Sequence, residues 1–414
     1  MYSSITKKQL SMKNKIYITG IGVISSLGNS AGDFFSSIKN QKENISDNLN
    51  PYFKREAKIS QGTFVKNFDP EIFIDPMKSR RMDGFIQFGF SSVTQAMKDA
   101  GIENDLIIKK DAAFIFNTTY GPFNTSYEYL ETLFTKGPGK VLSSQFSNSV
   151  VNALNGHVAM HYGTKGNNTM LVSTSPIEYA FSLLGSGQVD MAIVTGTEQL
   201  SDSIADVFEI FVSKNEKKFN KISAFDKNYS TGIFGDGSVT LVLETEKSAL
   251  ARNSRKYCEI GDPATRYDRQ LNYNLCELSN DGELLQSAMK ESLTYFNFTE
   301  HDIDLICSAT NSFAGMNYSE AAAIKNLFKQ KSVPITSSKS YLGETLGASE
   351  LFNVLWAIFV IKEQTIPCIN NLSDPIDNSL DLVKGRHRNC PINNILLNSF
   401  YFGGAVSSVV CRKP

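Results

Sequence analysis

The sequence has no cysteine in its first 257 residues, and all six cysteines lie between Cys258 and Cys411. None of them forms a CxxC pair, and the four histidines lie apart from them, so the spacing does not predict a zinc site. We therefore expect neither a metal nor a cofactor. The absence of cysteine from the first 257 residues also excludes a thiolate nucleophile from more than half of the chain.

An excess of charge of one sign is missing too. Lys plus Arg (41) and Asp plus Glu (42) nearly cancel, which removes the electrostatic basis for binding nucleic acid or a membrane surface. No stretch approaches the roughly 18–20 uninterrupted apolar residues that span a bilayer. The richest, 351–361, is too short, and residues 1–15 contain lysines but no apolar run after them. We expect a cytosolic protein with reduced thiols that binds neither nucleic acid nor membrane.

Helices and apolar strands alternate along the 414 residues, a length that suits two packed domains or a duplicated one. Residues 15–28 predict a buried strand of β-branched residues that ends in glycines. From 80 to 100, apolar residues recur at helical spacing with Gly101 as C-cap, and a strand at 112–119 follows. This alternation indicates an α/β fold with mostly parallel sheets.

The second half of the chain repeats the order of the first. A helix at 283–295 with the triplet Ala-Met-Lys, an acidic turn and a strand at 304–309 match the helix, turn and strand at 80–119, which carry the same triplet. The repeat predicts two related halves. We place them at 14–252 and 253–414, after an N-terminal extension at 1–13.

Five stretches carry motifs that occur together, and in the same order, in one enzyme family. They are YITGIGVISSLG (17–28), KSRRMDGFIQF (78–88), GPGKVLSSQFSNSVVNALNGHVAMHYGTKG (137–166), AFDKNYSTGIFGDGSVTLVLETEKSALAR (224–252) and NSFYFGGAVSSVV (398–410). The set resembles the elongating β-ketoacyl-acyl-carrier-protein synthases of the thiolase superfamily. The resemblance implies a five-layered αβαβα fold of two similar halves. It also implies a dimer in which the strand at about 167–174 pairs with its counterpart across a two-fold axis.

The nucleophile that this family uses is missing. A decarboxylating condensation needs a thiolate, because it is both a strong nucleophile and a good leaving group. Counting forward from 163–166 places the family's cysteine position on Ser175, whereas counting back from 187–190 places it on Met170. The difference indicates a shortened nucleophile turn, and neither count gives a cysteine.

The two family histidines, which stabilise the developing oxyanion, are also missing. Ala309, or Thr310 after a one-residue slip, stands at the first position, and Glu344 stands at the second. Lys339 is retained just before the second position, but the glutamate that the family pairs with this lysine is replaced by Asn353. The glycine loop at Gly403 and Gly404 is retained as well. The resemblance therefore implies a member of the family without its catalytic groups.

The remaining histidines do not supply them. His157 and His161 are four residues apart, a spacing that permits metal binding, but no HExxH glutamate accompanies them and a structural role is favoured. His301 and His387 lie in polar stretches, where we expect solvated side chains. The glycines at 232–237 lack the lysine and the helix of a phosphate loop and predict a tight turn instead.

An inactive partner is a known role in this family, that of the chain-length factor of type II polyketide synthases. We expect a non-catalytic subunit that pairs with an active ketosynthase, and through it with acyl carrier protein, in aromatic polyketide or polyene biosynthesis. Chain-length factors commonly carry glutamine at the nucleophile position, where this chain has Ser175 or Met170. Two alternatives stay open, an acyltransferase or hydrolase that uses Ser175 and a homodimeric acyl-binding scaffold.

The segment at 121–134 is predicted to help set product length, because the equivalent region of the family reaches the dimer interface near the acyl tunnel. Spacings of i, i+3 and i+7 place Tyr127, Leu130 and Phe134 on one face if the segment is helical. We expect tunnel-lining residues at Phe116, Phe123, Tyr127, Leu130 and Phe400. Leu133 and Phe134 are expected to pack in the core. The aromatic residues at 400–402 are expected to be buried, at the acyl entrance or in the core.

Overall fold

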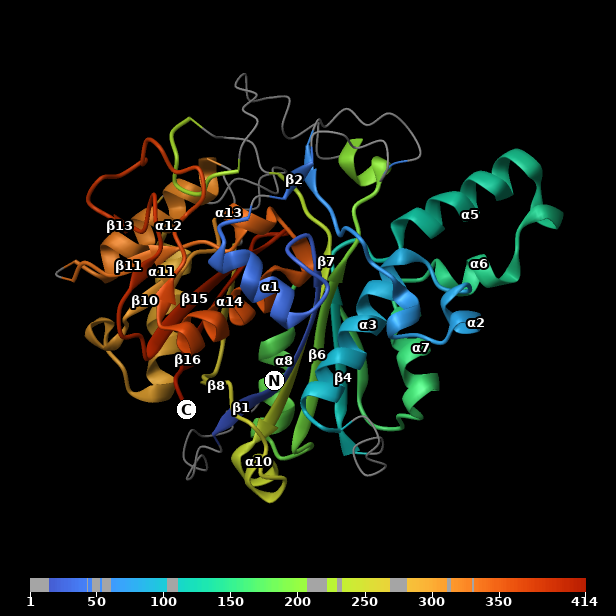
Figure 1. Cartoon of the computed structure of the whole chain (residues 1–414), viewed down its shortest axis with the longest axis horizontal. Coiled ribbons are helices and arrows are strands. Elements are labelled where there is room, and N and C mark those ends of the chain that lie inside the picture. The colour runs from blue at the N-terminus through green and yellow to red at the C-terminus, as the bar shows by residue number, and fades with distance from the viewer. Residues whose placement is uncertain are drawn as a thin grey trace, which may run out of the picture.

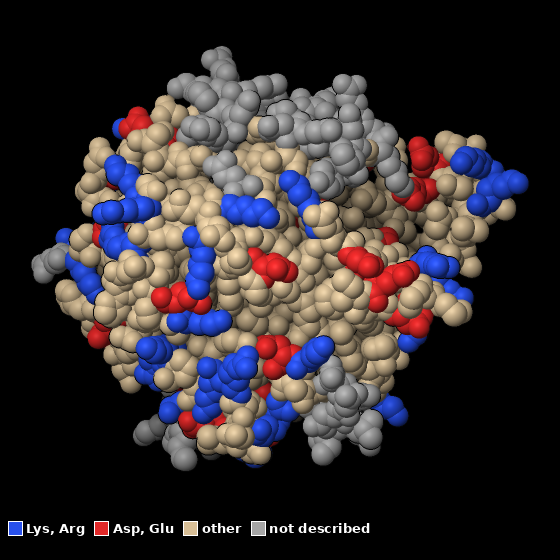
Figure 2. Space-filling model, viewed as in Figure 1, with Lys and Arg blue, Asp and Glu red and all other residues tan. Residues whose placement is uncertain are grey.

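The computed structural model describes residues 15–42, 44–46, 53, 61–102, 111–206, 222–228, 233–268, 281–310, 314–329 and 331–414. In this part of the chain a twelve-stranded mixed sheet runs through the molecule, with helices packed on both of its faces (Figure 1). No helix among the described residues is long and apolar enough to cross a membrane. Lysine, arginine, aspartate and glutamate are interspersed over the face shown in Figure 2.

The strands of the two halves follow the same plan. In the first half the order across the sheet is β5 (Asn168–Val172), β4 (Ala113–Thr118), β6 (Met191–Glu198), β7 (Gly237–Thr245) and β1 (Ile16–Ser25). In the second it is β11 (Pro334–Thr336), β10 (Leu305–Cys307), β15 (Asn394–Tyr401), β16 (Ala405–Arg412) and β8 (Cys258–Ile260). In both, the first two pairings are parallel and the next two antiparallel. The predicted duplication is therefore visible in the register itself.

The prediction of mostly parallel sheets is wrong. Antiparallel pairs bring β7 between β6 and β1 and bring β16 between β15 and β8, and β1 pairs antiparallel with β8 to join the halves. Both kinds of strand are buried on both faces here, as β1 and β7 are along their whole length. A continuous apolar run therefore could not tell the two orientations apart.

Two helices form the middle of the molecule. α8 (Pro176–Gly185) packs on β4 and β6, and α14 (Ser349–Glu363) contacts strands of both halves, namely β6, β7, β10 and β15. α14 is buried from Ser349 to Ile361, which explains the richest apolar stretch of the sequence. α1 (Ala31–Lys39) packs on α14 through the rings of Phe34 and Phe352, whose centroids are 6.1 Å apart.

Further helices cover the outer faces. α3 (Gly84–Asp99) lies on β1, β6 and β7, and α7 (Ala153–Tyr162) packs on α3, while α11 (Glu283–Leu293) lies on β16 and packs against α12 (Ala314–Leu327). With each half of the sheet counted as one layer, the order is helix, sheet, helix, sheet, helix, the five-layered αβαβα fold of two halves. A Cβ atom on Gly22 would lie 2.0 Å from the carbonyl oxygen of Ser92, so glycine is what lets α3 approach β1 so closely.

Shorter elements complete the fold. α5 (Phe123–Lys136) and α6 (Ser143–Asn148) project from the body beside α7 (Figure 1). The others are α2 (Pro76–Ser79), α10 (Glu246–Ala251), α13 (Lys339–Leu342), the strands β2 (Ile45–Ser46), β3 (Gly62–Thr63), β9 (Ala264–Tyr267), β12 (Thr365–Ile366), β13 (Asp381–Leu382) and β14 (Arg388–Asn389), and 3-10 turns at Pro70–Ile72, Pro138–Lys140, Thr294–Phe296, Glu300–Asp302 and Leu346–Ala348.

Candidate functional site

Two of the three positions that would carry the family's chemistry lie just beyond strands, near the edge where α/β folds build their sites, and the third lies in a turn between helices. Ser175 follows β5 and caps the N-terminus of α8, Ala309 follows β10, and Glu344 lies in the turn between α13 and α14. Met170, the other candidate for the nucleophile position, lies inside β5 opposite Phe116 of β4. Of the two, only Ser175 stands at the turn from strand to helix.

Ser175 makes the contacts of a helix cap. Its hydroxyl donates to both oxygens of Glu350, at 2.8 and 3.0 Å, and accepts from the backbone N–H of Glu178 at 3.1 Å. A serine at this position satisfies an orphan N–H of the first helical turn. The side chain is 2% exposed. In the described part of the chain, no hydrogen bond joins Ser175 to Ala309 or Glu344.

Glu350 is a buried carboxyl group that sequence reasoning missed. Burial raises its pKa to about 7, against the opposing effect of the hydrogen bond from Ser175. Burial, and then the Glu350 charge, raise the pKa of Tyr401 well above its usual range; the buried Tyr401 hydroxyl faces this carboxyl without a well-formed hydrogen bond. The signal for Glu350 in the sequence was a lone acidic residue at the start of the most apolar run.

Ala309 stands at the position expected for the first family histidine, and hydrogen bonds to Glu320 hold its backbone and its neighbours in place. Ala309 is fully buried, and its backbone N–H donates to both oxygens of Glu320 at 3.1 Å. Ser308 and Asn398 donate to the same carboxyl group, at 2.8 and 2.9 Å. Thr310 is also fully buried and donates to Asn317. The Ala309 methyl group offers no donor to an oxyanion.

The position of the second family histidine holds an ion pair. Glu344 lies 2.6 Å from the Lys339 ammonium group, and the two side chains are 1% and 2% exposed. The other oxygen of Glu344 accepts from the Leu346 N–H at 2.9 Å and the Ser349 hydroxyl at 2.6 Å. Glu344 is thus held on both sides in a structural role.

Two further buried carboxyl groups, those of Glu198 and Asp236, lie near this site and were not identified from the sequence. Glu198, at the end of β6, accepts from the N–H groups of Thr119, Tyr120 and Gly347 at 2.7, 3.0 and 3.3 Å. Burial raises its pKa to about 7, and burial together with the Glu198 charge raises the pKa of Asp236 to about 8. Glu198 therefore ties the start of the α5 segment to the turn before α14.

These carboxyl groups predict a stability that falls as the pH rises. The folded-state pKa values of Glu198, Asp236 and Glu350 lie above the unfolded values of 4.5, 3.8 and 4.5, so the folded chain binds more protons and loses stability as the pH passes through 7 and 8. Between pH 6.5 and 8.5 we expect the free energy of unfolding to fall by about 3 kcal/mol, as measured by urea denaturation. Asp236→Asn should flatten this dependence, and a flat or rising profile in the unaltered chain would contradict the prediction.

The predicted tunnel residues divide into buried and exposed sets. Phe116 and Phe400 are buried at 1% and 3% exposure, whereas Tyr127 and Leu130 on α5 are 37% and 48% exposed. Phe123 is half-buried, with its ring edge-on to Tyr120 at 6.3 Å. Tyr401 and Phe402 are buried, as expected for 400–402.

The prediction that Phe134 packs in the core is wrong. Phe134 is 81% exposed, Leu133 is only half-buried, and none of the 14 residues of α5 is buried. The spacing of the apolar residues predicts that one face of this helix is apolar. The spacing alone does not show whether that face packs against the same chain.

Apolar residues continue from α5 onto its neighbours. The exposed ones are Leu130 and Phe134 on α5, Leu142 and Phe146 at α6, Val150 and Val151 before α7, and Val172 on β5. α7 packs against β5 and α6, and α6 packs against α5, so these elements adjoin. Among the described strands β5 pairs with β4 alone and forms one end of the sheet. We call this surface the β5 edge surface.

The histidines have structural partners. His157 lies 3.0 Å from Asn148, and burial lowers its pKa, in line with the structural role favoured by its sequence context. His161 is exposed at the end of α7, with its ring edge-on to Phe90. The prediction that His387 is solvated is wrong, because it is half-buried and bridges the Ile38 carbonyl, at 2.9 Å, and the Cys368 N–H, at 3.1 Å. His301 is mostly exposed.

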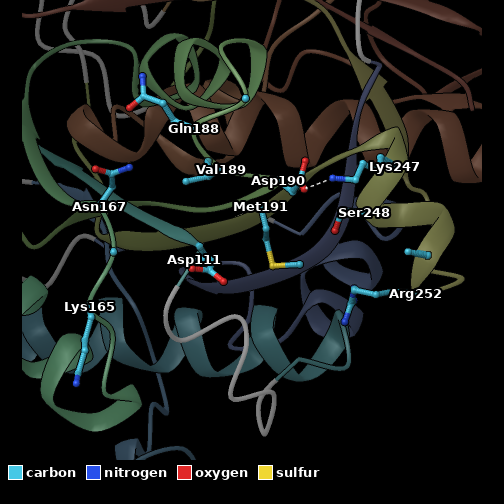
Figure 3. Close-up of a pocket in the computed structure, with 14 residues that line it drawn as sticks. Asp111, Lys165, Asn167, Gln188, Val189, Asp190, Met191, Lys247, Ser248 and Arg252 are labelled. Carbon is cyan, nitrogen blue, oxygen red and sulfur yellow. Dashed lines mark hydrogen bonds and ion pairs between the residues drawn. The ribbon is translucent and has the colours of Figure 1, made fainter.

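A cleft of 860 Å³ lies at the end of β4 and β6 that is opposite to the end near Ser175 (Figure 3). It is lined at the amino ends of β4 and β6 by Asp111 and Met191, and it is crossed by an ion pair of 2.9 Å between Asp190 and Lys247. Lys165 points away from the others in this view. The cleft therefore does not belong to the site at Ser175, Ala309 and Glu344.

The fold of two matching halves and the placement of these residues define a thiolase-like protein of the ketosynthase type. Family models described as "Beta-ketoacyl synthase, N-terminal domain" and "Beta-ketoacyl synthase, C-terminal domain" match residues 13–249 and 257–373. The chain belongs to the β-ketoacyl synthase family.

Relatives and solved structures agree with this assignment. The chain is 25% identical to a 3-oxoacyl-[acyl-carrier-protein] synthase 2 of Coxiella burnetii, over 97% of this chain and 99% of the relative, and 26% identical to one of Staphylococcus aureus, over 98% and 99%. A structure titled "The ishigamide ketosynthase/chain length factor" superposes with a TM-score of 0.87 at 20% identity, covering 97% of this chain and all of the other. A complex of AntDE with the carrier protein AntF gives 0.85, also at 20% identity, and covers 97% and 100%. These two likenesses establish the fold.

Proposed function

We propose that the protein is a non-catalytic, chain-length-factor-like subunit that pairs with an active ketosynthase in type II polyketide biosynthesis. The observation that carries this proposal is the replacement of all three reactive positions at once. Ser175 is a buried helix cap, Ala309 offers no donor, and Glu344 is bound to Lys339. Each is fixed by its own contacts, so the site is well packed without its chemistry.

The β5 edge surface supports the pairing part of the proposal. A sheet edge presents unpaired backbone N–H and C=O groups, and natural proteins rarely leave such an edge bare beside apolar side chains. Here Val172, Leu130 and Phe134 are 51%, 48% and 81% exposed in the single chain. A partner with a matching edge would cover them, and such permanent interfaces typically bury about 2,000 Å² or more.

The polyketide part of the proposal is drawn from the names of two matching structures. The matching structures include a ketosynthase with its chain length factor, and a ketosynthase in complex with an acyl-carrier protein of a type II polyketide synthase. By analogy, acyl carrier protein would reach this chain through the complex, in the cytosol. The sequence relatives are named as 3-oxoacyl synthases, and the replaced positions distinguish this chain from an enzyme of that kind.

Co-expression tests the proposal. An intact ketosynthase with the Cys-His-His set, encoded beside this chain, is co-expressed with it, with a tag on one subunit only. We expect a complex with one copy of each chain, whereas this chain expressed alone aggregates. A stable, soluble monomer at micromolar concentration would refute the heterodimer. A homodimer that does not bind the ketosynthase would also refute it and would favour the scaffold alternative.

A second candidate function is acyl transfer or hydrolysis through Ser175. The contact of 2.8 Å between its hydroxyl and Glu350, whose pKa is about 7, is the arrangement that a nucleophile and its base require. Against it, the Ser175 hydroxyl already caps α8 and the side chain is 2% exposed. The cap accounts for the contact with Glu178, and the hydrogen bonds to Glu350 give a buried carboxyl group a donor.

Product length tests the tunnel residues. Changing Phe123 or Tyr127 singly to alanine in the complex is expected to lengthen the product, because a ring that blocks a tunnel excludes further methylenes at a cost of roughly 1–3 kcal/mol. Phe116 is changed to leucine, since alanine at a site with 1% exposure would cost about 3–5 kcal/mol of stability. Products are weighed by mass spectrometry, with Tyr318→Ala on α12 as an exposed control. Unchanged products from all three variants, in complexes that form normally, would show that this region does not set the length.

A further inference from the structure

Lys339 is buried beside positions at which the family's catalytic groups are absent. The Lys339 side chain is 2% exposed, and a buried ammonium group without a counter-ion costs several kcal/mol in proteins. Its recorded hydrogen-bond acceptor in the described part of the chain is Glu344, at 2.6 Å. The lysine can therefore stay charged in the interior because Glu344 stands in the same turn.

Asn353, in the second turn of α14, contacts the residue that precedes Lys339. Its side-chain oxygen accepts from the hydroxyl of Ser338, the residue directly before Lys339, and its amide group donates to the Asn398 carbonyl at 2.8 Å. All of these residues are buried. The resemblance of the sequence to the ketosynthases implies that position 353 corresponds to the glutamate that pairs with this lysine, and position 344 to a histidine.

We infer that the carboxylate that neutralises Lys339 has moved in this chain from position 353 to position 344. The turn that holds a histidine in active synthases is thereby a structural ion pair, with Glu344 as a positioning residue for Lys339 and for the backbone at Leu346. This goes beyond the proposed function and needs no partner. We therefore expect the substitution Glu344→His to restore no activity, because it would leave the buried Lys339 without its counter-ion.

The surrounding charges make positions 344 and 353 depend on each other. Glu320 is also close enough for the Lys339 charge to favour its ionised form, although burial dominates and raises the Glu320 pKa. The surroundings of Lys339 thus contain one cation and two carboxyl groups, those of Glu344 and Glu320. Removing Glu344 leaves the lysine without its contact partner, and adding a glutamate at 353 beside Glu344 gives three carboxyl groups for one cation.

A double-mutant cycle tests the inference. Glu344→Gln, Asn353→Glu and the double variant are compared with the unaltered chain by chemical denaturation, all in the same state, alone or in complex. We expect each single change to lower the folding equilibrium constant at least about 100-fold, as broken buried pairs do. The double variant is expected to recover at least about tenfold of that loss. Where single variants do not fold, soluble yield is the readout, and the double variant should restore it.

The matched control is Glu344→Gln with Asn353→Gln, which has the size of glutamate without its charge. No recovery in the double variant, or equal recovery with glutamine at 353, would overturn the inference. Because the cycle is read on this chain itself, the absence of a ketosynthase partner would refute the proposed function without affecting the result.

Discussion

Tested on its own, with a solubility tag where needed, the chain is expected to release no carbon dioxide from a malonyl thioester and to form no acyl-enzyme. The reaction needs a thiolate and oxyanion donors, and the loss of one such donor alone costs about 10²–10³ in rate. Here Ser175, Ala309 and Glu344 supply neither. A rate at least about 10³-fold below that of an intact synthase is the expected result.

Two measurements check this expectation. Release of labelled carbon dioxide reports decarboxylation, and intact mass spectrometry after incubation with acyl carrier protein reports acylation. Ser175→Ala is the control, because it removes the hydroxyl that donates to both oxygens of the Glu350 carboxyl group. An acyl mass on the unaltered chain that disappears in Ser175→Ala would establish the acyltransferase alternative.

Charges on the β5 edge surface are expected to abolish pairing with the ketosynthase. Leu130→Asp combined with Phe134→Asp should weaken the complex at least about 100-fold, since apolar anchors at the centre of an interface are each worth about 2 kcal/mol or more. The two side chains are 48% and 81% exposed in the single chain, so the fold should tolerate the change. Affinity is measured by titration of the labelled chain with the ketosynthase.

Leu250→Asp on α10 is the matched control, because Leu250 is an equally apolar side chain, 63% exposed, at the other end of the molecule. It should leave the affinity unchanged. An unaltered affinity in the Leu130 and Phe134 variant would place the partner elsewhere.

The duplication could be predicted from the sequence, because each half buries its strands and helices in the same order. β4 and β10, and α3 and α11, lie within a few residues of the predicted bounds. Strand orientation could not be predicted, since β1 and β7 are antiparallel yet as uniformly buried as the parallel β4. The local pattern of apolar residues reflects burial, whereas the parallel or antiparallel orientation of a strand depends on its neighbours in the sheet.

The candidate site shows the same division. The sequence predicts the absence of reactive groups from residue identity alone, for instance at Ala309. The contacts made at these positions could not be predicted, because the contact of Ser175 with Glu350 joins residues 175 positions apart. The contacts of His387 could not be predicted for the same reason, because its partners, Ile38 and Cys368, come from other parts of the chain.

Under the proposed function, the edge of β5 that has no partner among the described strands sets a condition on how a cell makes this protein. A copy that finds no partner exposes an unpaired strand beside Leu130, Phe134 and Leu142, which is a template for aggregation or for binding by chaperones and proteases. Surplus copies would therefore be removed rather than stored. Adjacent genes translated in equal measure would keep the orphan pool small, and the amount of the ketosynthase would then set how much of this subunit persists.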